Sequence, residues 1–266
     1  MILKKIGLSD EENRKHLISM CLFGKSPSIY TKGAIQNAKL RDKIYPDFKI
    51  RFYVDENVDE TIVSQLLEEK AEVFIYRSLP GRAGQLMRFL PLAGDDDDDR
   101  VTIVRDCDSR INLREKVAVS EFLKSGKRFH LMYEHMHPKN TIFGGMFGVR
   151  GGIPKLCEKI QKSLRSCEKY GDDMVFLDRV LLPMMNDLNT MKHGEAGHSD
   201  KYDDTLLPYR DKVYHGYVGQ VILCNCPFEM YVSKGCDHAT RKVPCSVATL
   251  VHSSPKVLFN LSKFLG

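Results

Sequence analysis

Apolar and amphipathic segments alternate over the first 110 residues, and this alternation limits the folds open to the chain. We expect buried strands at 16–24, 49–55, 71–77 and 100–106, with helices at 32–45 and 60–70 and a shorter helix around 85–89. Strands that alternate with helices form right-handed βαβ units around a mostly parallel sheet. The expected fold class is therefore α/β, with a mixed, mostly parallel central sheet flanked by helices.

The second half of the chain has a less regular pattern. Strands are expected at 128–135, 141–149 and 217–223, helices at 153–170 and 171–183, and a polar loop at 186–212. We find no internal repeat and no long linker. The sequence therefore predicts a single domain over residues 1–266, long enough to bury a sizeable core.

Composition excludes several classes of protein. The chain is 42% hydrophobic and 28% charged, and it has no apolar run near the ~20 residues that a membrane span needs. The first residues lack a signal-peptide pattern, so we expect a cytoplasmic protein with its eight cysteines mostly as free thiols. The net charge of +5 is spread over scattered lysines, which argues against nucleic acid as a partner.

Two aspartates follow the expected strand in RVTIVRDCDSR, residues 100–110. Asp106 and Asp108 are spaced D-x-D at the carboxyl end of the strand, the edge where α/β sheets bind ligands. Paired carboxylates there suit Mg²⁺ or a similar hard cation together with a diphosphate. The alternative is structural: a helix N-cap with an ion pair to Arg105 or Arg110.

A wider set of motifs surrounds this D-x-D. They are YTKGAIQNA (30–38), R-F-x-P (88–91), R-D-x-D-S-R (105–110), R-E-x-x-A-V (114–119), H-x-H (135–137), G-G-M-F-G (144–148), Y-G-D-D (170–173) and YVGQV (217–221). In this order the motifs resemble the glycosyltransferases of GT-A fold found in large DNA viruses of algae and protists, and in some bacteria. The resemblance covers about residues 16–222 and departs at Cys107, inside the D-x-D, and at Tyr133, where an arginine is expected.

This resemblance implies an organisation and a reaction. The nucleotide-binding half would span about 16–110, the acceptor-binding half about 111–222, and an extension that matches no family 223–266. A sugar would pass from a nucleotide-diphosphate donor, which we expect to be a UDP-sugar, to a hydroxyl of a glycan or glycoprotein acceptor. A viral origin would place the enzyme in the host cytoplasm.

The resemblance also implies roles for single residues. Asp106, Asp108 and His198 would hold Mn²⁺ or Mg²⁺, and the donor would contact Phe23, Gly24, Asp55, Arg88, Asp106, Gly144 and Gly145. Each has a plainer alternative: Asp55 as a turn residue, Arg88 as a surface arginine, the two glycines as a hairpin turn, and His198 as a histidine without a metal. His135 and His137 would line the acceptor cleft or pair with carboxylates, and the acidic run 95–99 is expected to be a solvated loop.

The candidate base lies in YGDDMVFLDRVLLP, residues 170–183. Inverting transfer needs a carboxylate that removes the acceptor proton. We expect Asp172 to cap the helix and Asp173 to project into the cleft, with Phe176 and Leu177 facing the core. Asp173 is therefore the first candidate for the base and Asp172 the second, and both could instead only cap the helix.

Three other interpretations remain open. A phosphatase of the haloacid-dehalogenase type also places D-x-D after a strand. Its later G-D-x-x-x-D motif has a superficial match in this sequence at Gly171, Asp172 and Asp178. A domain of this fold could also bind a nucleotide sugar or glycan without catalysis. The late cysteines (Cys224, Cys226, Cys236 and Cys245, with His238) lack the usual zinc spacing and are expected to be free thiols.

Overall fold

The computed structural model describes residues 2–6, 14–24, 28–94, 99–133, 141–194, 205–206 and 218. Their elements, in chain order, are β1 (Ile2–Ile6), β2 (His16–Leu22), α1 (Ile29–Ile44), β3 (Phe48–Asp55), α2 (Glu60–Glu68), β4 (Glu72–Tyr76), the 3₁₀ helix η1 (Ala83–Leu92), β5 (Val101–Arg105), α3 (Leu113–Ser125), β6 (Phe129–Met132), β7 (Met146–Arg150), α4 (Leu156–Ser163), α5 (Asp172–Val180), the 3₁₀ helix η2 (Leu182–Met184), β8 (Thr190–Gly194) and β9 (Thr205–Leu206). The expected α/β class is confirmed.

The described strands form one mixed sheet in the order β1-β4-β3-β2-β5-β7-β6-β8-β9. β4, β3, β2 and β5 pair in parallel, whereas β7 runs antiparallel to both of its neighbours and β1 is antiparallel to β4. After β2 the chain builds outward through β3 and β4, and then returns to add β5 on the other side of β2. The strand order therefore reverses between β2 and β5, and such a switch point is where open α/β sheets place ligands.

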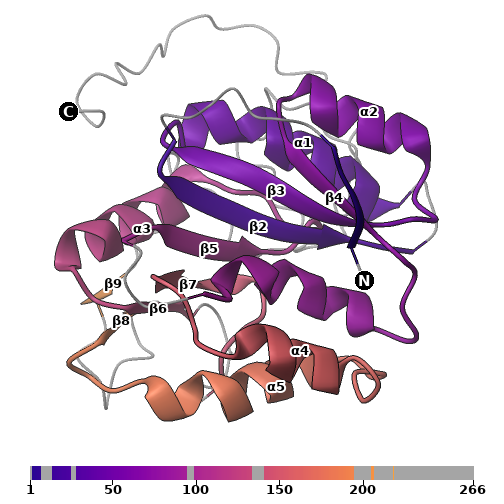
Figure 1. The fold of residues 1–266 in the computed structure, drawn as a ribbon. Helices are drawn as coiled ribbons and strands as arrows, with labels where there is room; N and C mark the ends of the chain where they lie inside the picture. The colour runs from indigo at the N-terminus through magenta and orange to yellow at the C-terminus, as the bar shows by residue number, and fades with distance from the viewer. Residues whose placement is uncertain are drawn as a thin grey trace, which may run out of the picture.

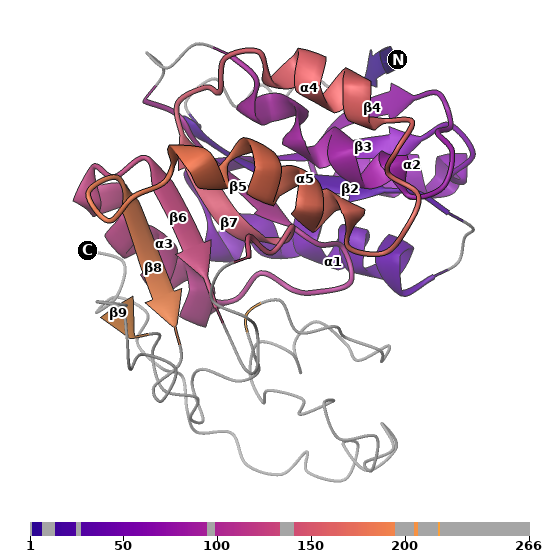
Figure 2. The same ribbon diagram turned by 90° about the horizontal axis from the view of Figure 1, so that it is seen from below.

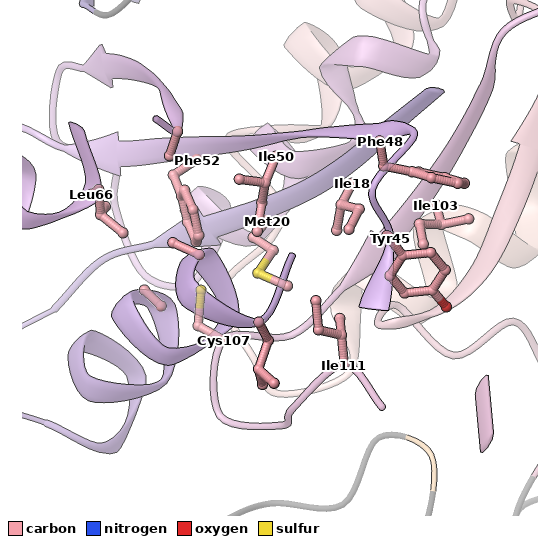
Figure 3. Packing of buried hydrophobic residues seen from close by; sticks show 14 of the residues in the cluster. Ile18, Met20, Tyr45, Phe48, Ile50, Phe52, Leu66, Ile103, Cys107 and Ile111 are labelled. Atoms are coloured by element: carbon pink, nitrogen blue, oxygen red, sulfur yellow. The ribbon is translucent and has the colours of Figure 1, made fainter. Parts of the chain in front are cut away.

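The two faces of the sheet are covered by different helices (Figures 1 and 2). Residues of α1, α2 and α3 pack with β2 and β3 on one face, and residues of η1, α4 and α5 pack with β6 and β7 on the other. Figure 3 shows the first cluster, in which Cys107 lies near Met20 and Ile111. Each face thus has its own apolar core, and the D-x-D loop is anchored in one of them.

Successive side chains of β2 point to opposite faces of the sheet, as they do in any strand. Ile18 and Met20 enter the core under α1, while Ser19 points to the other face and donates a hydrogen bond from Oγ to the Arg88 carbonyl oxygen (2.7 Å). All three side chains are fully buried. Ser19 therefore fixes η1, and with it Arg88, against the centre of the sheet.

Several element boundaries differ from the sequence-based expectations. The segment 186–212, expected to be loop, contains β8 and β9, because Thr190–Gly194 pairs in parallel with β6 and buries Thr190 and His193. The strand β1 was not expected. The strand predicted at 141–149 begins only at Met146, and the helix predicted at 153–170 ends at Ser163. Of the strand predicted at 217–223, only Val218 lies within the described residues.

Among the helices of the described segments, none is long and apolar enough to cross a bilayer.

Candidate active site

The D-x-D loop follows β5 at the switch point, and hydrogen bonds from Cys107 and Ser109 hold it in place. Cys107 is buried, and its Sγ donates to the carbonyl oxygen of Cys21 at the end of β2 (3.2 Å). Ser109 Oγ donates to the Asp106 carbonyl oxygen (3.1 Å). Gly33 of α1 lies so close to the Cys107 carbonyl that any Cβ there would overlap it. Lack of space therefore requires glycine at position 33, and α1 lies directly against the backbone of the D-x-D loop.

The alternative that the D-x-D aspartates cap the next helix is wrong. The N-cap of the next helix, α3, is Asn112, whose Oδ1 accepts from the backbone N–H of Glu115 (2.9 Å). Arg105 is buried and pairs with Glu115 (3.3 Å). Asp106 and Asp108 thus do not cap α3, and the partner of Arg105 is the carboxylate of Glu115.

Arg88 joins two of the predicted site carboxylates. Its Nη1 donates to Asp106 Oδ1, and its Nη2 donates to Asp173 Oδ2 (2.7 Å). The Arg88 side chain is 4% exposed and that of Asp173 is 7% exposed, whereas that of Asp106 is 43% exposed. The alternative that Arg88 is a surface arginine is therefore wrong. A buried guanidinium is favoured where it forms two such charge-assisted contacts.

The Gly144–Gly145 turn packs directly on this group. A Cβ on Gly144 would lie 2.5 Å from Asp173 Oδ2, and one on Gly145 would lie 2.5 Å from Asp106 Cγ. Neither glycine has a positive φ, so lack of space rather than backbone conformation requires glycine. The four predicted residues Arg88, Asp106, Gly144 and Gly145 and the predicted base Asp173 therefore form one compact group, which we call the Arg88 cluster.

Asp108 lies beside the Arg88 cluster and is electrostatically linked to it. Burial, and then the negative charge of Asp106, raise the pKa of Asp108 to about 6. Arg88 and Arg110 act in the opposite direction. The two D-x-D carboxylates are thus close enough for repulsion between them to matter, and a cation placed there would relieve that repulsion.

This arrangement fits a hard divalent cation. Mg²⁺ is usually held by one or two carboxylates together with phosphate oxygens and water, and Asp106 and Asp108 are two carboxylates of this kind. Within the described segments, no group of three or more histidine, cysteine, aspartate or glutamate side chains is arranged to hold a metal. His198, the third predicted ligand, lies outside the described residues.

One of the two aspartates of Y-G-D-D, Asp172, has a different structural role from the one predicted. The N-cap of α5 is Gly171, and Asp172 is the first helical residue. Asp172 Oδ2 accepts from the backbone N–H groups of Glu168 (2.8 Å) and Lys169 (2.7 Å), so its carboxylate orders the preceding turn. The expectation that Asp172 caps the helix is wrong, because its side chain folds back onto that turn. Asp173 does project away from solvent toward Arg88.

Residues expected to contact the nucleoside lie along the same edge of the sheet. Asp55 ends β3; its Oδ1 accepts from Asn57 N–H and its Oδ2 from Ser78 Oγ, both at 2.9 Å. These contacts are those of a turn residue. Phe23 follows β2 and packs close to Gly84 of η1, and Gly24 has φ +93°, a conformation that glycine adopts readily.

The remaining residues named from the sequence are not part of the Arg88 cluster or lie outside the described residues. Asp99, the last residue of the acidic run, pairs with Lys15 (2.5 Å) and Arg150 (2.6 Å), which lowers its pKa to about 2. Phe176 and Leu177 are buried as expected, and Tyr133 is buried in the same core. Asp178 accepts from Ile142 N–H (2.9 Å). The expectations for residues 95–98, His135, His137, His238 and the late cysteines Cys224, Cys226, Cys236 and Cys245 lie outside the described residues.

The sequence did not single out Ser19 as part of the site. Its one signal was a small polar residue inside an apolar strand, a pattern that often has no functional meaning. Its bond to the Arg88 backbone shows why a polar residue is needed there.

No family model and no curated protein matches the chain. Among solved structures, the chain is similar to the 4-diphosphocytidyl-2C-methyl-D-erythritol synthase of Anaerococcus prevotii. The two are 12% identical, and the match covers 68% of this chain and 87% of that one, with a TM-score of 0.41.

Proposed function

We propose that the protein is a metal-dependent glycosyltransferase of the GT-A type. It would move a sugar from a nucleotide-diphosphate donor, preferably a UDP-sugar, to a hydroxyl of a glycan or glycoprotein acceptor, with inversion at the sugar carbon. The observation that carries the proposal is the Arg88 cluster. In this cluster Arg88 contacts both Asp106 of the D-x-D and Asp173, although these two aspartates are 67 positions apart in the chain. The cluster lies beside the point where the strand order reverses.

Asp106 and Asp108 would hold Mn²⁺ or Mg²⁺ through which the donor diphosphate is bound. The cation would supply positive charge that stabilises the departing nucleoside diphosphate. Asp106 keeps a partly exposed carboxylate for this purpose, and Cys107 keeps the loop in the core beneath. Gly145 packs against Asp106 without a side chain, and a Cβ there would lie 2.5 Å from Asp106 Cγ.

Asp173 would remove the proton from the acceptor hydroxyl as the new bond forms. Its carboxylate is buried in the first turn of α5, and Arg88 fixes its orientation through Oδ2. Asp172 is less suited to this role, because its carboxylate already accepts two backbone N–H groups. Arg88 is thus a positioning residue for both the cation ligand and the base.

Binding can be tested separately from catalysis. Calorimetry of Mn²⁺ with UDP should show binding that Asp108→Asn abolishes while the fold remains intact. Asp187→Asn is the matched control, because the Asp187 side chain is 93% exposed and takes no part in the site. Unchanged UDP affinity in Asp106→Ala and Asp108→Asn would contradict the proposal.

Transfer is tested with a panel of nucleotide sugars and glycan acceptors. Asp173→Asn should lower turnover by about 10²-fold or more, the usual contribution of a general base, with donor affinity near that of the wild type. A product that keeps the anomeric configuration of the donor would contradict inversion. Donor binding without transfer across the panel would favour a binding domain without catalysis.

A further inference from the structure

Two buried side chains outside the Arg88 cluster hold the D-x-D loop, residues 106–111. The first is Asn37 of α1, which is fully buried. Its Nδ2 donates to the Ser109 carbonyl oxygen (2.8 Å), and its Oδ1 accepts from the Ile111 backbone N–H (3.0 Å). One side-chain amide thus satisfies two backbone groups of the loop, as a peptide group of a neighbouring strand would.

The second side chain is that of Arg110, which belongs to the loop itself and is 3% exposed. Its Nη1 donates to the carbonyl oxygens of Cys107 (3.1 Å) and Ser109 (2.8 Å), the residues on either side of Asp108. Its Nε donates to Oε1 of Gln36 in α1 (2.5 Å). Arg110 therefore closes the loop around Asp108 and joins it to the same helix as the asparagine.

Helix α1 is itself anchored in the core of the sheet. Its buried apolar residues pack in the cluster that it shares with β2 and β3: Ala34, Ala38, Leu40 and Ile44. Gly33 of the same helix lies against the Cys107 carbonyl, where a Cβ would overlap it. Figure 3 shows Cys107 and Ile111, near the two ends of the loop, against this core. Opening of the loop would therefore break the contacts that α1 makes to it.

The loop holds two like charges close together. Burial raises the pKa of Asp108, and the negative charge of Asp106 raises it further. Repulsion falls with distance, so charge alone favours an open loop in which the two carboxylates move apart. The contacts of Asn37 and Arg110 oppose that movement, because they fix the backbone on both sides of Asp108.

We propose that Asn37 and Arg110 are positioning residues that keep Asp106 and Asp108 together for cation binding in the metal-free protein. The inference rests on the proposed function, in which these aspartates hold Mn²⁺ or Mg²⁺. Both side chains are buried and bind the loop through its backbone, so they act on the cation through the aspartates. A prearranged site binds more tightly, because no loop has to be ordered when the ligand arrives.

The first test uses the metal-free protein and reports loop opening through Cys107, the middle residue of the D-x-D. In EDTA, Asn37→Ala should speed the modification of Cys107 by iodoacetamide about tenfold or more, because two hydrogen bonds of the closed loop are lost. Peptide mapping by mass spectrometry gives the rates. Cys167, which is buried on the other face of the sheet, is the internal reference and should keep its rate.

The control for this test is Ile44→Ala, which truncates a buried residue of the same helix without removing a contact to the loop. It should leave the ratio of the Cys107 and Cys167 rates unchanged, because a general loss of stability speeds both thiols alike. An unchanged Cys107 rate in Asn37→Ala, or an equal rise at both thiols, would overturn the inference.

Binding of Mn²⁺ alone, followed by the electron paramagnetic resonance of the free ion, gives a second test. The positive charge of Arg110 acts on Asp108, so loss of that charge by itself would strengthen cation binding. A positioning role predicts the opposite sign: Arg110→Gln should weaken Mn²⁺ binding about tenfold or more. Arg165→Gln changes an exposed arginine that follows α4, and as the matched control it should bind Mn²⁺ as the wild type does.

Equal or tighter Mn²⁺ binding by Arg110→Gln would overturn the inference. Failure of the proposed function is a separate result: a wild type that binds neither Mn²⁺ nor Mn²⁺–UDP would contradict it. In that case the Cys107 rates, which are measured without metal, would still decide whether Asn37 holds the loop closed.

Discussion

Arg88 and Asp173 are joined by a 2.7 Å contact between Nη2 and Oδ2, although 85 positions separate them in the chain. The same guanidinium also binds Asp106 at the end of β5. One buried arginine thus connects η1, β5 and α5, which come from both halves of the chain. The stability of the protein and the geometry of the site should therefore depend on the same residue.

Arg88→Met tests this dependence. The change would leave the Asp173 carboxylate buried without its partner, and breaking a buried pair in this way costs about 3–5 kcal/mol of unfolding free energy. We expect a loss near the lower end, because Asp106 is partly exposed to water. Urea denaturation measures it. Arg88→Lys should lose less, since it keeps the charge but cannot bind both carboxylates side by side. A loss below about 1 kcal/mol would show that the ion pairs contribute little.

Gly145→Ala should damage the site more than the fold. The added Cβ would lie 2.5 Å from Asp106 Cγ and 3.0 Å from its backbone nitrogen, so the D-x-D loop must move. Overpacking of this kind costs about 1–3 kcal/mol. Mn²⁺–UDP affinity should fall below detection in calorimetry. Gly148→Ala is the control: its Cβ would meet an Ile103 methyl group at 3.2 Å, away from the carboxylates. Equal affinities in both variants would refute the steric argument.

Stability should decline as the pH falls below about 6.5, the ordinary pKa of histidine. His130 is fully buried, and its pKa is well below that value because of burial and then the neighbouring His193. Below pH 6.5 the unfolded chain takes up a proton that the folded His130 does not. The unfolding free energy therefore falls by up to about 1.4 kcal/mol per pH unit for this group.

Urea denaturation at pH 7.5, 6.0 and 5.0 checks this pH dependence. His130→Gln keeps a polar side chain opposite His193, which His130 contacts at 2.9 Å, and should flatten the curve. Some slope should remain, because the pKa of the half-buried His16 is also lowered. A slope identical to that of the wild type would exclude His130 as its source.

Thiol reactivity should differ sharply between the described cysteines. Cys157 is exposed, whereas Cys21, Cys107 and Cys167 are buried. Burial raises the pKa of Cys21 to about 12 and that of Cys167 to about 11, and it raises the pKa of Cys107. Because the thiolate is the reactive form, iodoacetamide at pH 8 should modify Cys157 first. Peptide mapping by mass spectrometry measures the order. Early modification of Cys107 would show that the D-x-D loop opens in solution.

Sequence patterns predicted the elements of the first half of the fold closely. Strands and helices from His16 to Arg105 lie within a few residues of their predicted bounds, because apolar strands and amphipathic helices there have distinct periods. The sequence pattern wrongly predicted a loop at Thr190–Gly194, because the segment TMKHG is polar. Its burial comes from pairing with β6, which is a property of the sheet and not of the segment.

The sequence alone also determined which residues are chemically suited to the site. The D-x-D, the paired glycines and the two aspartates of Y-G-D-D were visible as residue types in short motifs. It could not determine how they meet, because contacts between residues 88, 106, 144 and 173 arise only when η1 and α5 pack together on one face of the sheet. Tertiary structure alone decided that Arg88 is buried between two carboxylates. It also decided that Gly144 and Gly145 are required by lack of space, and that Asp172 holds a turn while Asp173 faces the site.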